Sequence, residues 1–383
     1  MRGEHGTDSF VCGHCLDDAD LTEYIDSFGT VGATCTGCGR RDNPVVPMRE
    51  LGEFMRARME LFYGLAVNQL MWVGAEGGYM GWTADTDELL FDYIGFTLTD
   101  DGNDELRKCL VESIDGGSNE LWCEYSPAGE AYDASLLSDW NAFVKLVKYD
   151  RRFFFQNLHN EGDIIGHLVG QNLSTTLKEL ADLAAETGLL KPLNVGTKYF
   201  RARPRSDDQS YTLALELGPP PPEQALQSNR MNPPGIPMFY GSTNADLARI
   251  ETRSERVSIG EFDVVQRVVI LDLVDLPPIP GFFSGATRRE RLGLRFLHRF
   301  ADLISQPVPR DERTHLDYVP TQIFTEFLRD YRFGQHSLSG ITFRTATRQP
   351  GSNIVLFIDQ SGVADPGAET EKTLIVLIAS SDA

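Results

Sequence analysis

The chain has 383 residues, of which 41% are hydrophobic and 24% charged, a composition typical of a soluble globular protein with two or three domains. Its formal net charge of −21 argues against a broad nucleic-acid interface, because binding to phosphate backbones depends on clustered Lys and Arg. The sequence has no run of the roughly 20 apolar residues that a membrane-spanning helix needs, and its polar N-terminus lacks the apolar core of a signal peptide. We therefore expect a cytoplasmic protein without a membrane contact, in which a nucleotide would need a local basic pocket.

Two CxxC pairs, at 12–15 and 35–38, lie near the N-terminus. Such paired knuckles bring four thiolates to a tetrahedral zinc ion, and four sulfurs leave no open coordination position for chemistry. Six cysteines are too few for a disulfide scaffold in a chain of this length. The expected ligands of a structural zinc ion are Cys12, Cys15, Cys35 and Cys38. The alternatives are four ordinary reduced thiols, or a site in which His14 replaces one cysteine.

Apolar residues at three- and four-residue steps dominate the first half of the chain. They predict helices, in chain order, over 16–29, 48–73, 104–114, 140–147 and 174–188. The glycine-rich stretch 74–82 lacks the order GxGxxG and follows no strand, so it predicts a flexible connection between helices and not a phosphate-binding turn.

The pattern changes after Gly188, where a Lys-Pro pair and an Asn-Val-Gly turn interrupt the chain. Short runs of Val, Ile, Phe and Leu predict strands within 263–276 and 353–359, and helices are expected near 244–251, 288–304 and 321–330. The fold class is therefore α+β. The expected domains are a zinc knuckle over 1–46, a helical domain over 47–190 and a mixed α/β domain over 191–383.

Charged and aromatic residues are spaced among strand-like runs at the start of this last domain. Arg201 and Arg203 close a β-type run, and Arg230 precedes a Pro-Pro-Gly turn. Tyr240 ends an apolar run, and Glu251 follows on a predicted helix. Guanidinium groups bind phosphate oxygens bidentately, and a tyrosine ring packs against flat apolar surfaces. The set suits a ligand that carries phosphates and an aromatic ring.

The order of these residues resembles the RES domain, a bacterial NAD-degrading toxin family distantly related to ADP-ribosyltransferases. The motifs that carry the resemblance are FRAR at 200–203, LGPPP at 217–221, NRMNPPGIPMFY at 229–240, LARIE at 247–251, YVPTQ at 318–322, GITF at 340–343 and SNIVLF at 352–357. The resemblance implies an ADP-ribosyltransferase-like domain that binds NAD, as substrate, between two small sheets. The preceding region resembles the HEPN-like helical segment of some larger RES proteins.

The resemblance also implies roles for single residues. Glu251 would stabilise the positive charge that builds on the ribose carbon as nicotinamide leaves. Arg201 and Arg230 match the two arginines that bind the pyrophosphate, and Arg203 is a nearby substitute. Tyr240 would present its ring to nicotinamide or adenine. Each has an ordinary alternative: a solvated glutamate, arginines in surface ion pairs, and a tyrosine in the core.

Two further residues complete the expected site. Asn232 could position the neighbouring arginine or donate a hydrogen bond to NAD. Thr345 stands where the family has a serine, and it could orient nicotinamide or ribose through its hydroxyl. Its extra methyl group stiffens the side chain and takes space, so this departure bears on the rate or on activity itself.

Arg152 and His159 fall near the Arg/His pair of HEPN ribonucleases. The three phenylalanines between them look like core residues, and a highly acidic protein is poorly suited to RNA. We therefore do not expect nuclease activity from this pair.

These observations predict a toxin-like enzyme that cleaves the nicotinamide N-glycosidic bond of NAD and so depletes the cofactor. Water as acceptor would make it a glycohydrolase, and inorganic phosphate would make it a phosphorylase. The alternatives are transfer of ADP-ribose to a protein, and a catalytically silent binding module. An antitoxin or regulatory protein at the N-terminal domain is the expected partner, and self-association into a homo-oligomer is also considered.

Overall fold

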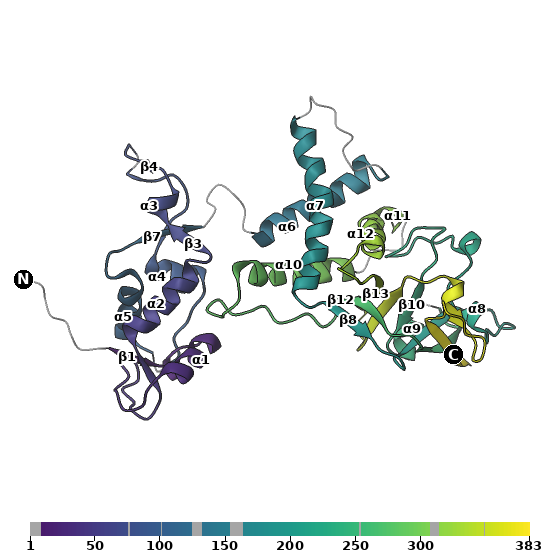
Figure 1. The fold of residues 1–383 in the computed structure, drawn as a ribbon, viewed down its shortest axis with the longest axis horizontal. Helices are drawn as coiled ribbons and strands as arrows, with labels where there is room; N and C mark the ends of the chain where they lie inside the picture. The colour runs from purple at the N-terminus through teal and green to yellow at the C-terminus, as the bar shows by residue number, and fades with distance from the viewer. Residues whose placement is uncertain are drawn as a thin grey trace, which may run out of the picture. The chain divides into compact units, whose positions relative to one another are not determined.

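The computed structural model describes residues 9–75, 77–100, 102–124, 132–153, 164–252, 254–306, 314–347 and 349–383. The chain divides into two compact units (Figure 1). The N-terminal unit comprises Met1–Ser135 with Pro278–Leu292, and the C-terminal unit comprises Leu136–Pro277 with Gly293–Ala383. The domain boundaries expected from the sequence stay predictions.

The N-terminal unit consists of short helices and strands. In chain order they are β1 (Phe10–Cys12), α1 (Ala19–Phe28), β2 (Val45–Pro47), α2 (Met48–Met59), β3 (Tyr63–Leu65), α3 (Ala66–Gln69), β4 (Trp72–Val73), β5 (Gly78–Tyr79), β6 (Ala84–Asp85), α4 (Thr86–Glu88), α5 (Asp104–Asp115) and β7 (Leu121–Glu124). Asp18 caps α1 by accepting a hydrogen bond from the Leu21 amide at 2.9 Å. The predicted helices near 16–29 and 104–114 are confirmed.

The single helix predicted over 48–73 is wrong as a continuous element, because α2 ends at Met59 and only α3 (Ala66–Gln69) is helical after it. Residues 63–65 form β3, which pairs antiparallel with β7 and sets Gly64 opposite Cys123. β4 and β5 then form a hairpin, with the rings of Trp72 and Tyr79 4.9 Å apart, where the sequence predicted a connection between helices. The apolar spacing suggested a helix, but pairing of β3 with β7 makes this segment a strand. Because β7 lies far along the chain, the local sequence pattern does not reveal this pairing.

A segment from later in the chain completes the core of the N-terminal unit. Leu51, Met55 and Trp122 are fully buried there. Phe283, in the segment Pro278–Leu292, joins the same core with 1% of its surface exposed. The neighbouring Phe282 packs its ring 4.9 Å from that of Phe62. The N-terminal unit is thus built from two separate stretches of sequence.

The remaining elements belong wholly or mainly to the C-terminal unit. They are α6 (Tyr132–Lys145), α7 (Ile164–Glu186), β8 (Leu190–Leu193), β9 (Lys198–Pro204), α8 (Ala214–Leu217), β10 (Phe239–Ser242), α9 (Ala245–Thr252), β11 (Val257–Val264), β12 (Val268–Asp272), α10 (Arg288–Ser305), α11 (Thr314–Asp317), α12 (Val319–Asp330), β13 (Leu338–Arg344), β14 (Ser352–Leu356), β15 (Val363–Ala364) and β16 (Ile375–Asp382). Helices α6, α10 and α12 meet through aromatic rings, with Phe300 4.9 Å from Trp140 and 5.1 Å from Phe324. The class is α+β, as expected.

Within the described residues, one mixed sheet of nine strands has the order β15-β16-β11-β9-β10-β14-β13-β12-β8. Strand β9 pairs with β11 from Lys198 to Pro204. On its other side, β9 meets β10 at a single residue pair, Phe200 opposite Ser242. The sheet therefore consists of two halves that are joined by one residue pair between β9 and β10. These two strands carry Arg201, Arg203 and Tyr240.

The two faces of the sheet have different characters around β10 and β14. Directly opposed residues share a face, and successive residues alternate between faces. Phe239 and Ile354 lie on the face that holds an apolar core. Tyr240, Ser242 and Asn353 lie on the other face, because Ser242 opposes Asn353 in the register. The strands thus bring three polar side chains to one side of the sheet.

In the part of the chain that the structure describes, no helix combines the length and apolar character that crossing a membrane requires.

Candidate functional site

Glu251 lies in the last turn of α9. This helix begins after Asn244, whose Oδ1 accepts a hydrogen bond from the Leu247 amide at 2.8 Å. The Glu251 carboxylate is half-buried, and its Oε1 accepts two hydrogen bonds, from Thr345 Oγ1 at 2.7 Å and from Asn353 Nδ2 at 2.9 Å. Among the described residues no hydrogen bond reaches Oε2. One oxygen is therefore held by the protein, and the other is left for a ligand.

Thr345 follows the end of β13 and acts on the carboxylate of Glu251. Its hydroxyl also accepts a hydrogen bond from the Thr347 amide at 3.0 Å and lies 2.9 Å from Thr347 Oγ1. The sequence placed Thr345 near nicotinamide or ribose, and that role stays a prediction. The contact that the structure provides is with Glu251.

Asn353 and Ser242 are members of the cluster that sequence reasoning missed. Ser242 Oγ donates a hydrogen bond to Asn353 Oδ1 at 2.7 Å, and both side chains are buried. Asn353 lies inside the motif SNIVLF. A polar amide within an otherwise apolar strand needs a hydrogen-bond partner, and this feature of the sequence could have indicated Asn353 as a site residue.

Gly351 allows the start of β14 to approach α9. Its φ is +124°, a conformation that other residues rarely adopt. A Cβ atom there would lie 2.7 Å from Thr243 Oγ1 and 2.8 Å from Asn244 Nδ2. The close approach brings Asn353 within hydrogen-bond reach of Glu251.

Two of the predicted site residues, Tyr240 and Asn232, are joined by a hydrogen bond. Tyr240 donates its hydroxyl proton to Asn232 Oδ1 at 2.7 Å and accepts a hydrogen bond from the Met231 amide at 3.0 Å. Asn232 is buried and donates to the Ile236 carbonyl at 2.6 Å. Burial raises the pKa of Tyr240, so its hydroxyl stays protonated near neutral pH. The hydroxyl is therefore occupied within the protein.

Arg230 donates hydrogen bonds to two backbone carbonyls of the protein. Its guanidinium donates to the Ile304 carbonyl, and through Nη2 to the Gln306 carbonyl at 2.7 Å, at the C-terminal end of α10. A cation is favourable there because the last carbonyls of a helix lack partners. Burial lowers the pKa of Arg230, whereas nearby Tyr318 and Glu251 oppose this shift. Arg230 thus lies within electrostatic range of Glu251 and keeps other N–H groups for a ligand.

Arg201 has no such protein partner. Its Nη1 atom is buried and makes no hydrogen bond with the described residues, and its guanidinium lies 5.5 Å from the centre of the Phe239 ring. The pKa of Arg201 is lowered to about 10, mainly by burial and also by the charge of Arg203, and Tyr240 opposes this shift. At neutral pH the group is still a cation, so a partly buried positive charge has one buried N–H group without a partner among the described residues.

Arg203, in contrast, has protein partners for its guanidinium. Its guanidinium donates to the Glu216 carbonyl and lies 4.3 Å from the centre of the Tyr211 ring. Of the three predicted arginines, Arg201 is therefore the one whose surroundings most clearly lack an anionic partner.

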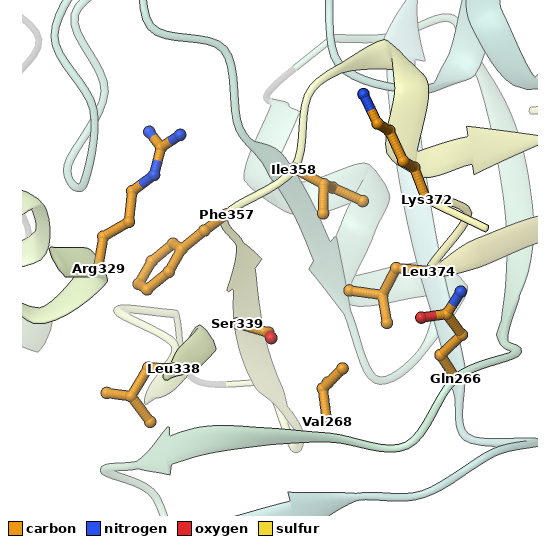
Figure 2. A pocket seen from close by; sticks show the side chains of 9 residues that line it. All are labelled: Gln266, Val268, Arg329, Leu338, Ser339, Phe357, Ile358, Lys372 and Leu374. Carbon is orange, nitrogen blue, oxygen red and sulfur yellow. The ribbon is translucent and has the colours of Figure 1, made fainter. Parts of the chain in front are cut away.

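A hollow of about 270 Å³ lies at the opposite ends of β13 and β14 from Thr345 and Asn353 (Figure 2). Its lining residues are Gln266, Val268, Arg329, Leu338, Ser339, Phe357, Ile358, Lys372 and Leu374. Figure 2 shows Arg329 and Lys372 on opposite sides of the segment that carries Phe357. None of the predicted site residues lines it, so we give more weight to the chemistry around Glu251.

The four N-terminal cysteines form a separate cluster. Their sulfur atoms all lie within 4.8 Å of one another, and Cys12 Sγ is 3.8 Å from Cys15 Sγ and 3.6 Å from Cys38 Sγ. Four sulfurs bound tetrahedrally at about 2.3 Å from zinc would be separated by about 3.8 Å. The donor set and its spacing therefore fit one metal ion, and Cys15 and Cys35, 3.7 Å apart, complete it.

The thiols of the cluster have different acidities. Burial raises the pKa of Cys12 to about 11 and also raises that of Cys15. Burial acts in the same direction on Cys35, but backbone N–H groups outweigh it, and its pKa is lowered. A metal ion would therefore displace protons as it binds.

Arg152 donates to the carbonyls of Val147 and Lys148, each at 3.4 Å, at the end of a helical segment. His159 lies outside the described residues. The comparison with an Arg/His ribonuclease pair therefore rests on the sequence alone.

Two family models match the chain. The RES domain matches residues 198–373, and HEPN/RES N-terminal domain 1 matches residues 30–161. The chain therefore carries a RES domain behind a HEPN/RES N-terminal region, which confirms the resemblance read from the motifs. The RES domain indicates an NAD-related, toxin-type function. Neither the comparison with curated proteins nor that with solved structures gave a match.

Proposed function

We propose that the C-terminal unit cleaves the nicotinamide N-glycosidic bond of NAD, with water or inorganic phosphate as acceptor. The partly buried guanidinium of Arg201, whose buried Nη1 atom has no hydrogen-bond partner among the described residues, is the observation that most supports a ligand with a pyrophosphate. A buried cation without an anion is costly, and bound phosphate oxygens would supply its hydrogen bonds. The carboxylate of Glu251, with Oε2 unoccupied, suits the other half of such a ligand.

The bond that breaks joins the ribose C1′ to the nicotinamide nitrogen. Its electron pair leaves with nicotinamide, which becomes neutral, and positive charge develops on the ribose. The Glu251 carboxylate would stabilise that charge, and the ring of Tyr240 would pack against a planar part of NAD. Water then attacks C1′ and loses a proton to give ADP-ribose. Phosphate attacks in the same way to give ADP-ribose-1″-phosphate.

The test is NAD consumption by the purified protein, with and without phosphate, and with products separated chromatographically. We expect nicotinamide to appear in equal amount to the NAD lost, and the second product to identify the acceptor. ADP-ribose attached to a protein would instead indicate the transferase alternative. Unchanged NAD under both conditions would contradict the proposal and favour a silent binding module.

Substituting Arg201→Met should stabilise the free protein while abolishing its response to NAD. The folded state lowers the pKa of this group, so its charged form costs stability at every pH below about 10. Removing a buried, unpaired charge should raise the free energy of unfolding by about 1–3 kcal/mol. NAD at about 100 times its Kd should stabilise the protein by about 2.7 kcal/mol while Arg201 is present. Denaturant unfolding with and without NAD measures both effects, with Glu251→Gln in every sample so that NAD is not consumed.

Arg203→Met is the matched control for stability. It removes the hydrogen bond to the Glu216 carbonyl and the contact with Tyr211, so it should destabilise the protein. Equal destabilisation by the two substitutions would show that Arg201 is a structural residue with partners of its own.

We also propose zinc as the metal of the four-cysteine cluster, in a structural role. Four thiolate donors at this spacing suit zinc and leave no coordination position for a substrate. The partner protein, the homo-oligomer and the cytoplasmic location stay predictions.

A further inference from the structure

The carboxylate of Glu251 is held asymmetrically. Thr345 and Asn353 come from neighbouring strand ends, yet both donate to the same oxygen, Oε1. Two donors on one oxygen restrict rotation of the carboxylate about its last torsion angle. The direction of Oε2 is therefore fixed by the hydrogen bonds to Oε1, since Oε2 accepts none among the described residues.

The orientation of the Asn353 amide follows from its two neighbours. A carboxylate can only accept hydrogen bonds, so the NH₂ group of Asn353 must face Glu251. The amide oxygen then faces Ser242, whose hydroxyl donates to it at 2.7 Å. Reversing the amide would place two acceptors, Oδ1 and a carboxylate oxygen, against each other. Ser242, Asn353 and Glu251 therefore form a chain of hydrogen bonds in which each donor has only one favourable orientation.

This chain of hydrogen bonds is rigid because two of its members lie on paired strands of the sheet. Ser242 on β10 lies directly opposite Asn353 on β14. Ser242 is 4% exposed and Asn353 is 9% exposed, so water competes little for either group. A buried hydrogen bond between paired strand positions keeps one geometry as long as the sheet is folded.

We infer that Asn353, oriented by Ser242, is a positioning residue that holds the Glu251 carboxylate where it can stabilise the positive charge that develops on the ribose. The inference rests on the proposed cleavage of NAD. Asn353 would act through Glu251 and not through NAD, so its loss should lower kcat and leave the KM for NAD nearly unchanged. A residue that only supported the fold would change stability and both constants together.

Asn353→Asp gives the sharpest test. The new carboxylate keeps an acceptor for Ser242, removes the donor to Glu251 and sets two acceptors face to face. We expect kcat to fall by about 10- to 100-fold, the loss associated with one hydrogen bond to a charged group, with KM within about two-fold of wild type. Ser242→Ala leaves the Asn353 donor in place but loosens it, so kcat should fall by only about two- to five-fold.

Asn194→Asp is the charge-matched control, since Asn194 is exposed just after the edge strand β8. It should leave both constants unchanged. A wild-type kcat in Asn353→Asp would overturn the inference alone, as would a joint change of kcat, KM and melting temperature. If Asn353→Asp does not fold, Ser242→Ala decides, and a wild-type kcat there overturns the inference. No NAD turnover by the wild-type protein would overturn the proposed function and this inference with it.

Discussion

Glu251→Gln is expected to lower NAD turnover by about 100- to 10,000-fold, the effect of removing a charge that stabilises a transition state. The amide oxygen of Gln can still accept the hydrogen bonds from Thr345 and Asn353. The side chain should therefore keep its position while it loses the negative charge that the developing ribose cation needs. KM should change little, because the interaction belongs to the transition state. Release of nicotinamide, followed chromatographically, measures the effect.

Glu255→Gln is the matched control for this substitution. Glu255 is exposed and follows α9 by only a few residues, so the same change of charge is made nearby without touching the cluster. It should retain wild-type turnover. Comparable turnover in Glu251→Gln and wild type would show that the carboxylate does not take part in the reaction.

Loss of the four-cysteine metal site is expected to have the largest effect on stability. Cys35→Ser should abolish stoichiometric zinc binding and unfold the segment around β1 and β2. Cys35 is 1% exposed, and its sulfur also accepts a hydrogen bond from the Cys12 amide at 3.4 Å. Zinc bound by such a site supplies about 10–16 kcal/mol of apparent binding free energy at neutral pH, and this energy is coupled to folding. Elemental analysis and thermal unfolding, with and without a chelator, measure the two effects.

Cys109→Ser is the appropriate comparison, because Cys109 is a half-buried thiol outside the cluster. It should keep the metal content and nearly the same melting temperature. Wild-type protein that is purified without metal, and that a chelator leaves unchanged, would contradict a structural zinc ion.

The four-cysteine cluster and the class of fold could be predicted from local information. The CxxC spacing places each pair of sulfurs in one tight turn, so the members of the cluster can be recognised in the sequence. The long helices α10 and α12 follow from regular apolar spacing in the same way. The helix over 48–73 failed because the pairing of Gly64 with Cys123 competes with local spacing.

The sequence named several residues of the candidate site, but it did not reveal their hydrogen-bond partners. The motifs named Glu251, Tyr240 and Asn232, and the structure joins the last two by a hydrogen bond. Asn353 reaches Glu251 across 102 positions in the chain, and Thr345 does so across 94. Such contacts depend on strand register, which a run of residues does not reveal.

The sequence by itself determined the α+β class, the grouping of four cysteines and the order of motifs that marks a RES domain. Only the tertiary structure decided how the arginines differ: Arg230 is bound to the end of α10, and Arg201 keeps a buried N–H group without a partner. It also decided that Asn353 and Thr345 share one oxygen of Glu251. The physical reason is that spacing along a chain sets local periodicity and turns, whereas burial and hydrogen-bond partners are set by packing between distant segments.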